Sequence, residues 1–270
     1  MKTNFFKAAI IIVSVIISAT SCNKDEREDL RQSAKDNALA EASFDDIHQQ
    51  TDNAYDEASE STKSILAGCP TISFLRTDST NADTIIVDFG TGCTDNRGIT
   101  RSGRIISTFT GKYRDAGTVI TTNTDNYYRN GNLIQGTKTV TNTGVDGNGS
   151  IIFNVQVTNA SVTTDEGVIS WNSTRTRKWI LGQNTTWPIW SDDVYLISGS
   201  ASGTNAKGNS FDVVITNDLR IELNCRWIVS GTLEITPEDG DTRTLDYGSG
   251  NCDDQATLTI KNKTYDITLR

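Results

Sequence analysis

Four cysteines in the later part of the chain carry the most readable chemistry in the sequence. They are Cys69, Cys93, Cys225 and Cys252, separated by 24, 132 and 27 residues. A structural zinc site usually takes its thiolate ligands in close pairs, whereas four cysteines in an oxidising compartment form two disulfide bonds. The spacing favours two disulfides over a zinc site built from all four thiolates. We expect no metal and no other cofactor.

A short element that occurs twice predicts how these cysteines pair. Residues 88–95 read DFGTGCTD, and residues 246–254 read DYGSGNCDD. Each copy follows an upstream cysteine across a strand-turn-strand pattern, so we expect the bonds Cys69–Cys93 and Cys225–Cys252. The glycines of each copy suit turns with positive φ.

Three other roles for the repeated element stay open. Glycine-rich loops with acidic residues bind calcium or phosphate in other proteins. Asp88 and Asp246 would form a pair for acid–base chemistry if the two copies packed together.

The tryptophans provide the candidate ligand contacts. Trp187 and Trp190 flank Pro188-Ile189 in a stretch that is not a clean strand. Aromatic side chains in loops form platforms on which sugars can stack, although they also cap hydrophobic cores. Trp187 and Trp190 are therefore possible ligand-binding residues.

Composition excludes several function classes. The net charge of −9 and the pI of about 4.7 make the chain a poor partner for nucleic acid, whose phosphates need clustered Lys and Arg. A single histidine, His48, argues against a Ser-His-Asp hydrolase and excludes a histidine-rich metal site. The pair Arg175 and Arg177 shares one face of a predicted strand, where it either holds an anion or is simply solvated.

Residues 1–21 have the pattern of a signal peptide. Lys2 and Lys7 precede an apolar run at residues 8–17, which is too short for a membrane-spanning helix of about 20 residues. Small residues then lead to a fifth cysteine, Cys22. This arrangement resembles the lipobox of bacterial lipoproteins, with Ala19 where leucine is usual. The resemblance implies that Cys22 carries acyl chains such as palmitate, which bind the membrane at about 0.8 kcal/mol per methylene. An ordinary secretory signal is the alternative.

The residues after Cys22 suggest a location. Lys24, Asp25 and Glu26 are similar to the surface-export signal of Bacteroidetes lipoproteins, a lysine followed by two acids. The resemblance implies an outer-membrane lipoprotein that faces the cell surface. Because every residue from Lys24 to Asp29 is charged, a chance occurrence and a periplasm-facing anchor stay open.

A composition shift near residue 67 suggests three segments: a signal peptide at 1–21, an acidic tether and helix at 22–67, and a β domain at 68–270. Residues 23–66 contain 12 acids and 5 bases, while every Gly, Pro and Trp lies after residue 67. We expect a flexible tether at 23–36 and a helix at 43–60, because Ser43 and Asp46 resemble a capping box. One apolar stripe of that helix would comprise Phe44, Ile47, Thr51, Tyr55 and Ala58.

Residues 68–270 alternate apolar and polar positions between frequent turn signals, which is typical of strands joined by hairpins. The fold class we predict is mainly β: a large antiparallel curved sheet, sandwich or barrel, with one N-terminal amphipathic helix covering an apolar part of it. The predicted strands are 84–89, 104–113, 118–128, 133–143, 151–158, 168–180, 194–202, 211–217, 226–235, 257–260 and 264–269.

Taken together, these patterns resemble the uncharacterised β-rich outer-membrane lipoproteins of the Bacteroidetes type, a group that brings no activity with it. We expect a surface-exposed lipoprotein with a non-enzymatic binding or envelope role. Its partners would be the membrane, through acyl chains on Cys22, and a glycan or other surface ligand, but no nucleic acid. The alternative is a surface hydrolase that acts on glycan or peptide through paired carboxylates.

Overall fold

The computed structural model describes residues 22–60, 65–66, 69–75, 83–185 and 191–269. It divides into two compact units, residues 1–31 and 32–270. The described part of the first unit, residues 22–31, is helical. The second unit, called the β unit below, contains residues 32–60 of the same helix and every strand. Among the described residues, none of the helical sequence is long and apolar enough to cross a membrane.

The helix α1 runs from Cys22 to Glu60 and is longer than the sequence patterns predicted. The expected flexible tether at 23–36 is wrong, because these residues are helical and Gln32, Ser33 and Asp36 are buried. Ser43 is not a cap: it lies inside the helix and its hydroxyl donates to the carbonyl of Leu39 at 2.7 Å. The physical reason is that no Gly or Pro interrupts this alanine-rich segment.

All strands belong to one sheet, in which every paired neighbour is antiparallel. Strands follow each other in chain order from β1 to β15, except that β4 pairs only with β5, beside that path. The bounds are β1 Ile65–Leu66, β2 Thr71–Leu75, β3 Asp83–Asp88, β4 Cys93–Thr94, β5 Thr100–Phe109, β6 Val119–Arg129, β7 Asn132–Val145, β8 Ile151–Thr164, β9 Gly167–Leu181, β10 Val194–Thr204, β11 Ser210–Glu222, β12 Ile228–Pro237, β13 Arg243–Ser249, β14 Gln255–Ile260 and β15 Lys263–Thr268.

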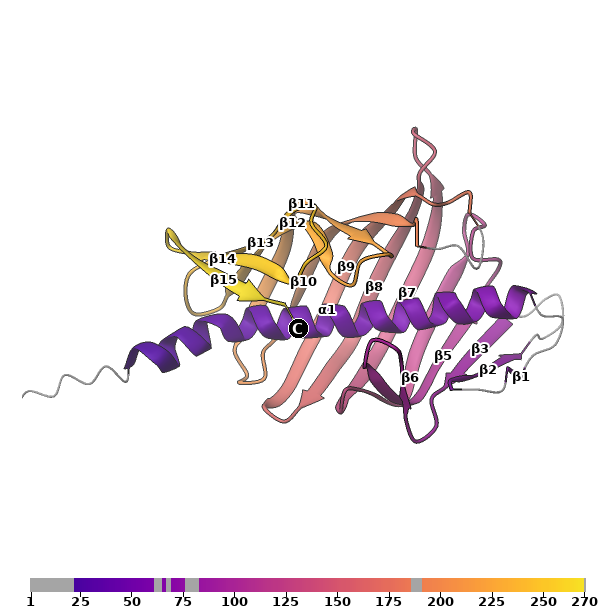
Figure 1. Ribbon diagram of the computed structural model, residues 1–270, viewed down its shortest axis with the longest axis horizontal. Coiled ribbons are helices and arrows are strands. Elements are labelled where there is room, and N and C mark those ends of the chain that lie inside the picture. Colours follow the sequence, from indigo (N-terminus) through magenta and orange to yellow (C-terminus); the bar gives the residue numbers. More distant parts are fainter. Residues whose placement is uncertain (1–21, 61–64, 67–68, 76–82, 186–190, 270) are drawn as a thin grey trace, which may run out of the picture. The chain divides into compact units, whose positions relative to one another are not determined.

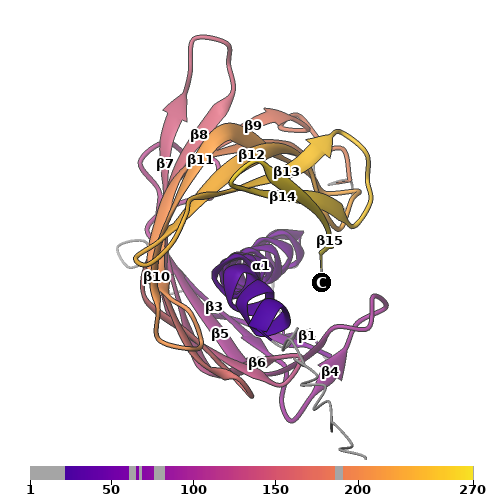
Figure 2. The same ribbon diagram turned by 90° about the vertical axis from the view of Figure 1, so that its left-hand side faces the viewer.

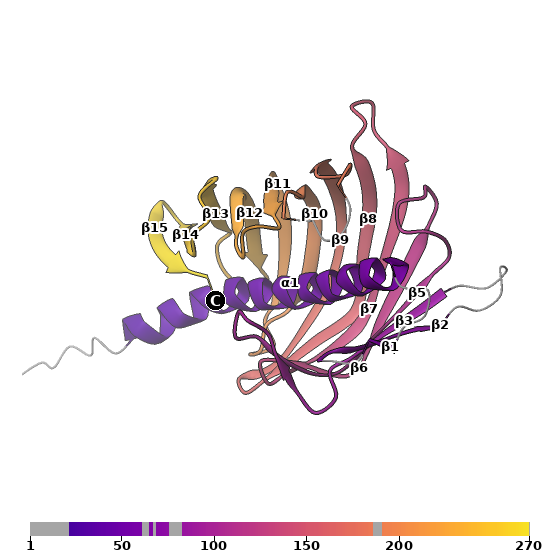
Figure 3. The ribbon, with the colours of Figure 1, turned by 45° about the vertical axis from the view of Figure 1, so that its right-hand side comes forward.

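The sheet of the β unit curves around residues 32–60 of α1, which lie on its concave side (Figure 2). It stays open, since β1 and β15 do not pair with each other among the described residues. Figures 1 and 3 show these two edge strands at opposite ends of the sheet along the helix axis. The predicted mainly β fold with one N-terminal helix is therefore confirmed, in the form of an open curved sheet.

The core lies between the concave face and the helix. In β8, Phe153, Val155 and Val157 are buried while Asn154 and Gln156 between them are exposed, as the two-residue period of a strand requires. The same alternation buries the predicted core residues Trp171 and Trp179 on β9, each 2% exposed. Trp227, also expected in the core, is half-buried.

One close approach fixes where the helix crosses the sheet. The ring of Phe44 stacks on Trp171, with 5.7 Å between ring centroids. A side chain at Gly136 of β7 would place its Cβ 2.8 Å from the Cα of Ala160 and 3.1 Å from the ring of Phe44. The φ of Gly136 is also +140°, a conformation that other residues rarely adopt. Glycine is therefore required at this crossing.

Candidate binding site

The repeated element forms a stapled turn at two places in the sheet. The structure contains both bonds that the sequence predicts, Cys69–Cys93 and Cys225–Cys252, each with 5.7 Å between Cα atoms. In both copies the first cysteine lies just before a two-strand hairpin, β2–β3 or β12–β13, and the second follows that hairpin. Cys93 begins the short strand β4, which pairs with β5, whereas Cys252 lies in a loop, so the two elements share their disulfide and turn but differ at the second cysteine.

The first aspartate of each element accepts a hydrogen bond from a backbone N–H within its own turn. Asp88 Oδ1 accepts a hydrogen bond from the N–H of Gly90 at 2.8 Å, and Asp246 Oδ1 accepts one from Gly248 at 2.8 Å. Both glycines have positive φ, as predicted for these turns. Asp88 lies on β3 and Asp246 on β13, which are not neighbours in the sheet. The geometry therefore gives no sign of the carboxylate pair that the hydrolase alternative invoked.

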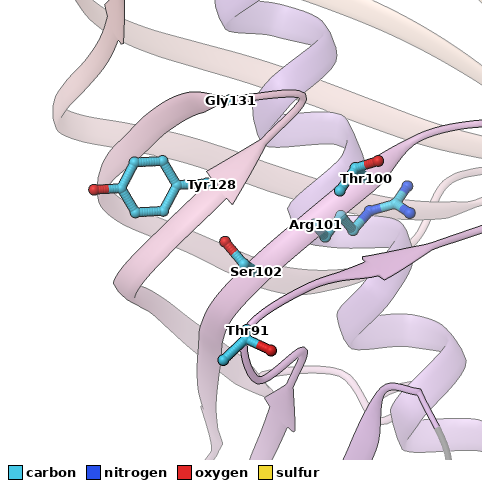
Figure 4. A pocket seen from close by; sticks show the side chains of 6 residues that line it. All are labelled: Thr91, Thr100, Arg101, Ser102, Tyr128 and Gly131. Atoms are coloured by element: carbon cyan, nitrogen blue, oxygen red, sulfur yellow. The ribbon is translucent and has the colours of Figure 1, made fainter.

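A pocket of about 340 Å³ opens beside the first stapled turn (Figure 4). Three chain segments line it: the turn at Thr91, the start of β5, and the hairpin that joins β6 to β7. The lining residues are Thr91, Thr100, Arg101, Ser102, Tyr128 and Gly131. Thr91 belongs to the repeated element, but none of the six residues was predicted from the sequence as a ligand contact. The only available signal was the pair Tyr127-Tyr128, because a strand that buries Tyr127 must present Tyr128 on the polar face.

Local hydrogen bonds hold the pocket walls in place. The turn Asn130–Gly131 has positive φ at both residues, which suits a tight hairpin turn. It is joined to β5 because Asn130 donates its N–H to the carbonyl of Thr100 at 2.8 Å and accepts the N–H of Thr100 at its side-chain oxygen at 3.0 Å. The hydroxyl of Thr100 pairs with that of Thr94 on β4 at 2.9 Å. The pocket is therefore built on a rigid corner.

Arg101 separates the pocket from the interior. Figure 4 shows its guanidinium directed away from Tyr128. Nε and Nη2 donate to the two carboxylate oxygens of Asp46 on α1, at 2.9 and 2.5 Å, and Nη1 donates to Asp95 at 2.8 Å. Burial opposes ionisation of Asp95, but hydrogen bonds from Arg101, Ile99 and Arg97 outweigh it and lower the pKa of Asp95. Two carboxylates thus face this one guanidinium.

This pair belongs to an inner charged layer between sheet and helix. On the sheet side the layer comprises Arg101, Arg129, Lys138, Arg175 and Arg177, and on the helix side Glu41, Asp46 and Asp52. The sequence suggested that Arg175 and Arg177 either hold an anion or face solvent. In the structure, Arg175 instead donates two hydrogen bonds to the carboxylate of Glu41, at 3.1 and 2.9 Å.

Arg177 and Lys138 are also bound in this layer, Arg177 beside aromatic rings and Lys138 by a backbone carbonyl of the helix. Arg177 donates to the hydroxyl of Tyr113, and its guanidinium lies 4.7 Å from the ring centre of Phe153. Lys138 donates to the carbonyl of Phe44 at 2.8 Å, and burial lowers the pKa of Lys138 to about 8. The layer therefore binds the helix, and its cations are not available to an external anion.

Several residues that the sequence analysis named do not belong to this pocket. Trp187 and Trp190 lie outside the described residues. Lys24, Asp25 and Glu26 lie within the helical residues of the first unit. His48 packs beside the sheet with its side chain 13% exposed, 3.0 Å from Asp52. Among the described residues there is no group of three or more His, Cys, Asp or Glu placed to hold a metal ion.

Comparison with known proteins adds no relative: no family model, no curated protein sequence and no solved structure matches this chain.

Proposed function

We propose that the protein is a lipid-anchored outer-membrane lipoprotein of the Bacteroidetes type, exposed at the cell surface, with a non-enzymatic binding role. The anchor is an acyl-modified Cys22, and Lys24, Asp25 and Glu26 act as the export signal. The lipobox pattern that precedes Cys22 supports the first point, and the charged triplet after it supports the second.

One structural observation carries the proposal: the helix that begins at Cys22 is the same helix that fills the β unit. The chain passes from Cys22 along α1 without a break into residues that are buried against the sheet, such as Ala40, Phe44 and Ile47. An acyl chain on Cys22 would therefore hold the β unit from its N-terminal side, because Cys22 precedes residues 32–60 of the helix in the chain.

The interior gives no support to an enzymatic role. The buried carboxylate of Asp46 accepts hydrogen bonds from Arg101 and from the hydroxyl of Tyr127, and Glu41 is paired with Arg175. A carboxylate that acts as an acid or base must reach its substrate. The carboxylates of the inner charged layer lie between the helix and the sheet, where they bind the sheet's cations and hold the helix in place.

Metabolic labelling with an alkynyl fatty acid tests the anchor. We expect the wild-type protein to incorporate the label and to fractionate with membranes, and the Cys22→Ser variant to do neither. The double substitution Cys225→Ser and Cys252→Ser serves as the matched control, because it removes both cysteines of one disulfide in the β unit and leaves Cys22 in place. Absence of label from the wild-type protein, or equal labelling of Cys22→Ser, would contradict the proposal.

A further inference from the structure

The pocket beside the first stapled turn contains polar side chains without a side-chain hydrogen-bond partner in the described part of the chain. The hydroxyls of Thr91, Ser102 and Tyr128 make no side-chain hydrogen bond with any other described residue. Each hydroxyl can both donate and accept. Figure 4 shows the hydroxyl of Tyr128 at the end of its ring that points away from Thr91 and Ser102, so Thr91 and Ser102 are the two groups placed to bind hydroxyls of a ligand.

The pocket also offers an aromatic ring to solvent. Tyr128 is 38% exposed, and it is the only aromatic residue among the large hydrophobic side chains that the described part of the chain leaves exposed. Its neighbour Tyr127 is fully buried, and its ring packs at a tilt against Phe89 with 5.7 Å between ring centroids, which fixes the strand beneath Tyr128. An exposed aromatic ring with hydroxyl groups around it suits the apolar face and polar rim of a sugar ring.

Charge decides between neutral and anionic ligands. The single cation of the pocket lining is Arg101, and its guanidinium is bound to the carboxylates of Asp46 and Asp95. It is 4% exposed and turned away from the pocket. An anion would therefore find no free positive charge there, and a neutral ligand is favoured.

The walls need little rearrangement to receive a ligand. The disulfide Cys69–Cys93 staples the turn that carries Thr91, and the Asn130–Gly131 turn is hydrogen-bonded to β5. A pre-organised site loses less entropy when it binds. The volume of about 340 Å³ lies at the small end of ligand pockets, which fits one or two sugar rings.

We infer that this pocket binds a neutral pyranose ring, stacked on Tyr128 and hydrogen-bonded by Thr91 and Ser102, as part of a larger glycan. The inference names the ligand class of the binding role proposed above and rests on that role. It does not depend on Cys22, on the membrane or on the side of the membrane that the protein faces.

Ligand-observed NMR on the full mature lipoprotein tests it, in a detergent without a sugar headgroup. The probes are methyl β-D-glucopyranoside, methyl β-D-galactopyranoside and methyl α-D-mannopyranoside, with glucuronate as the anionic comparison. We expect saturation transfer to at least one neutral probe and weaker transfer to glucuronate. We expect Tyr128→Ala to weaken binding about tenfold. Tyr128→Phe keeps the ring and should lose less.

Val168→Ala is the matched control, since Val168 is an exposed apolar side chain on β9, outside the pocket. It should leave sugar binding unchanged. Three results would overturn the inference: no neutral probe binds, Tyr128→Ala binds as well as the wild type, or glucuronate binds more tightly than the neutral sugars. A protein that takes up the fatty-acid label at Cys22 but binds no sugar would retain its anchor and lose only this site.

Discussion

Asp46 of α1 and Arg101 of β5 form a bidentate ion pair across the interior of the β unit, and both side chains are 5% exposed. The hydroxyl of Tyr127 donates to the same carboxylate at 2.7 Å. The pair joins residues 55 positions apart and connects the helix with the strand that also lines the surface pocket. Docking of the helix and order at the pocket therefore depend on the same contact.

Replacement of Asp46 by Ala should lower the free energy of unfolding by about 3–5 kcal/mol, because it leaves Arg101 buried with one carboxylate fewer. Urea denaturation of the mature protein measures this. Asp125→Ala is the control: Asp125 pairs with Arg104 at 3.1 Å, but the two side chains are 39% and 50% exposed. A surface pair contributes about 0–1 kcal/mol. Equal effects of the two substitutions would show that the buried pair does not hold the helix.

Gly136→Ala should destabilise the β unit by about 2 kcal/mol. The added methyl would meet the Cα of Ala160 and the ring of Phe44, and the backbone would be strained at the φ of Gly136. Gly147→Ala is the matched control, since a Cβ at that position meets nothing within 4 Å. Thermal denaturation compares the two variants, and a Gly136→Ala protein as stable as Gly147→Ala would exclude the close crossing.

Asp193 should make stability depend on pH. Burial raises its pKa to about 6, above the ordinary value near 4, although the hydroxyl of Tyr195 donates to it at 3.1 Å. The folded state then binds more protons than the unfolded state between these values. The ionised carboxylate of Asp193 therefore destabilises the folded state at neutral pH. This destabilisation disappears as the pH falls through 6 towards 4, because the carboxylate becomes protonated in the folded state.

Asp193→Asn, which keeps an oxygen acceptor for Tyr195, should therefore raise the free energy of unfolding at pH 7.5 by about 1–2 kcal/mol. The gain should vanish near pH 4. Denaturant titrations of both proteins at the two pH values test this. A difference between wild type and variant that is the same at both pH values would refute the assignment.

Loss of the Cys225–Cys252 disulfide should lower the free energy of unfolding by about 3.5 kcal/mol, the loop-entropy value for closing a loop of this length. The double substitution Cys225→Ala and Cys252→Ala removes that bond, which spans 27 residues. The matched double substitution at Cys69 and Cys93 removes the 24-residue loop and should have a similar effect. Urea denaturation gives both values, and no loss in either variant would show that the staples do not stabilise the fold.

The strands could be predicted from the sequence because their signal is local. The two-residue alternation of Phe153, Val155 and Val157 marks β8 without reference to any other part of the chain. Strand β13 was missed because its last residues form the repeated turn element, although Arg243, Leu245 and Tyr247 alternate inward. The disulfide pairs were predictable for the same local reason, since each closes its own hairpin.

The helix start and the pocket depend on contacts between distant residues, which one sequence does not show. Asp36 is buried because its carboxylate accepts the N–H of Ala206 at 2.7 Å, a residue 170 positions away. The same helical segment, judged by its charge alone, looked like a solvated tether. The pocket likewise needs three separate segments to meet around Tyr128, and the one that carries a motif, the repeated element with Thr91, does not identify the other two.

Antibody access to the β unit on living cells measures whether the protein is exposed at the cell surface. An antibody raised against the β unit would be applied to intact and to permeabilised cells of a Bacteroidetes-type host. We expect equal labelling of intact and permeabilised cells for the wild type. For the variant with Lys24, Asp25 and Glu26 replaced by Ala, we expect labelling only after permeabilisation. Wild-type protein that is labelled only in permeabilised cells would contradict the surface lipoprotein.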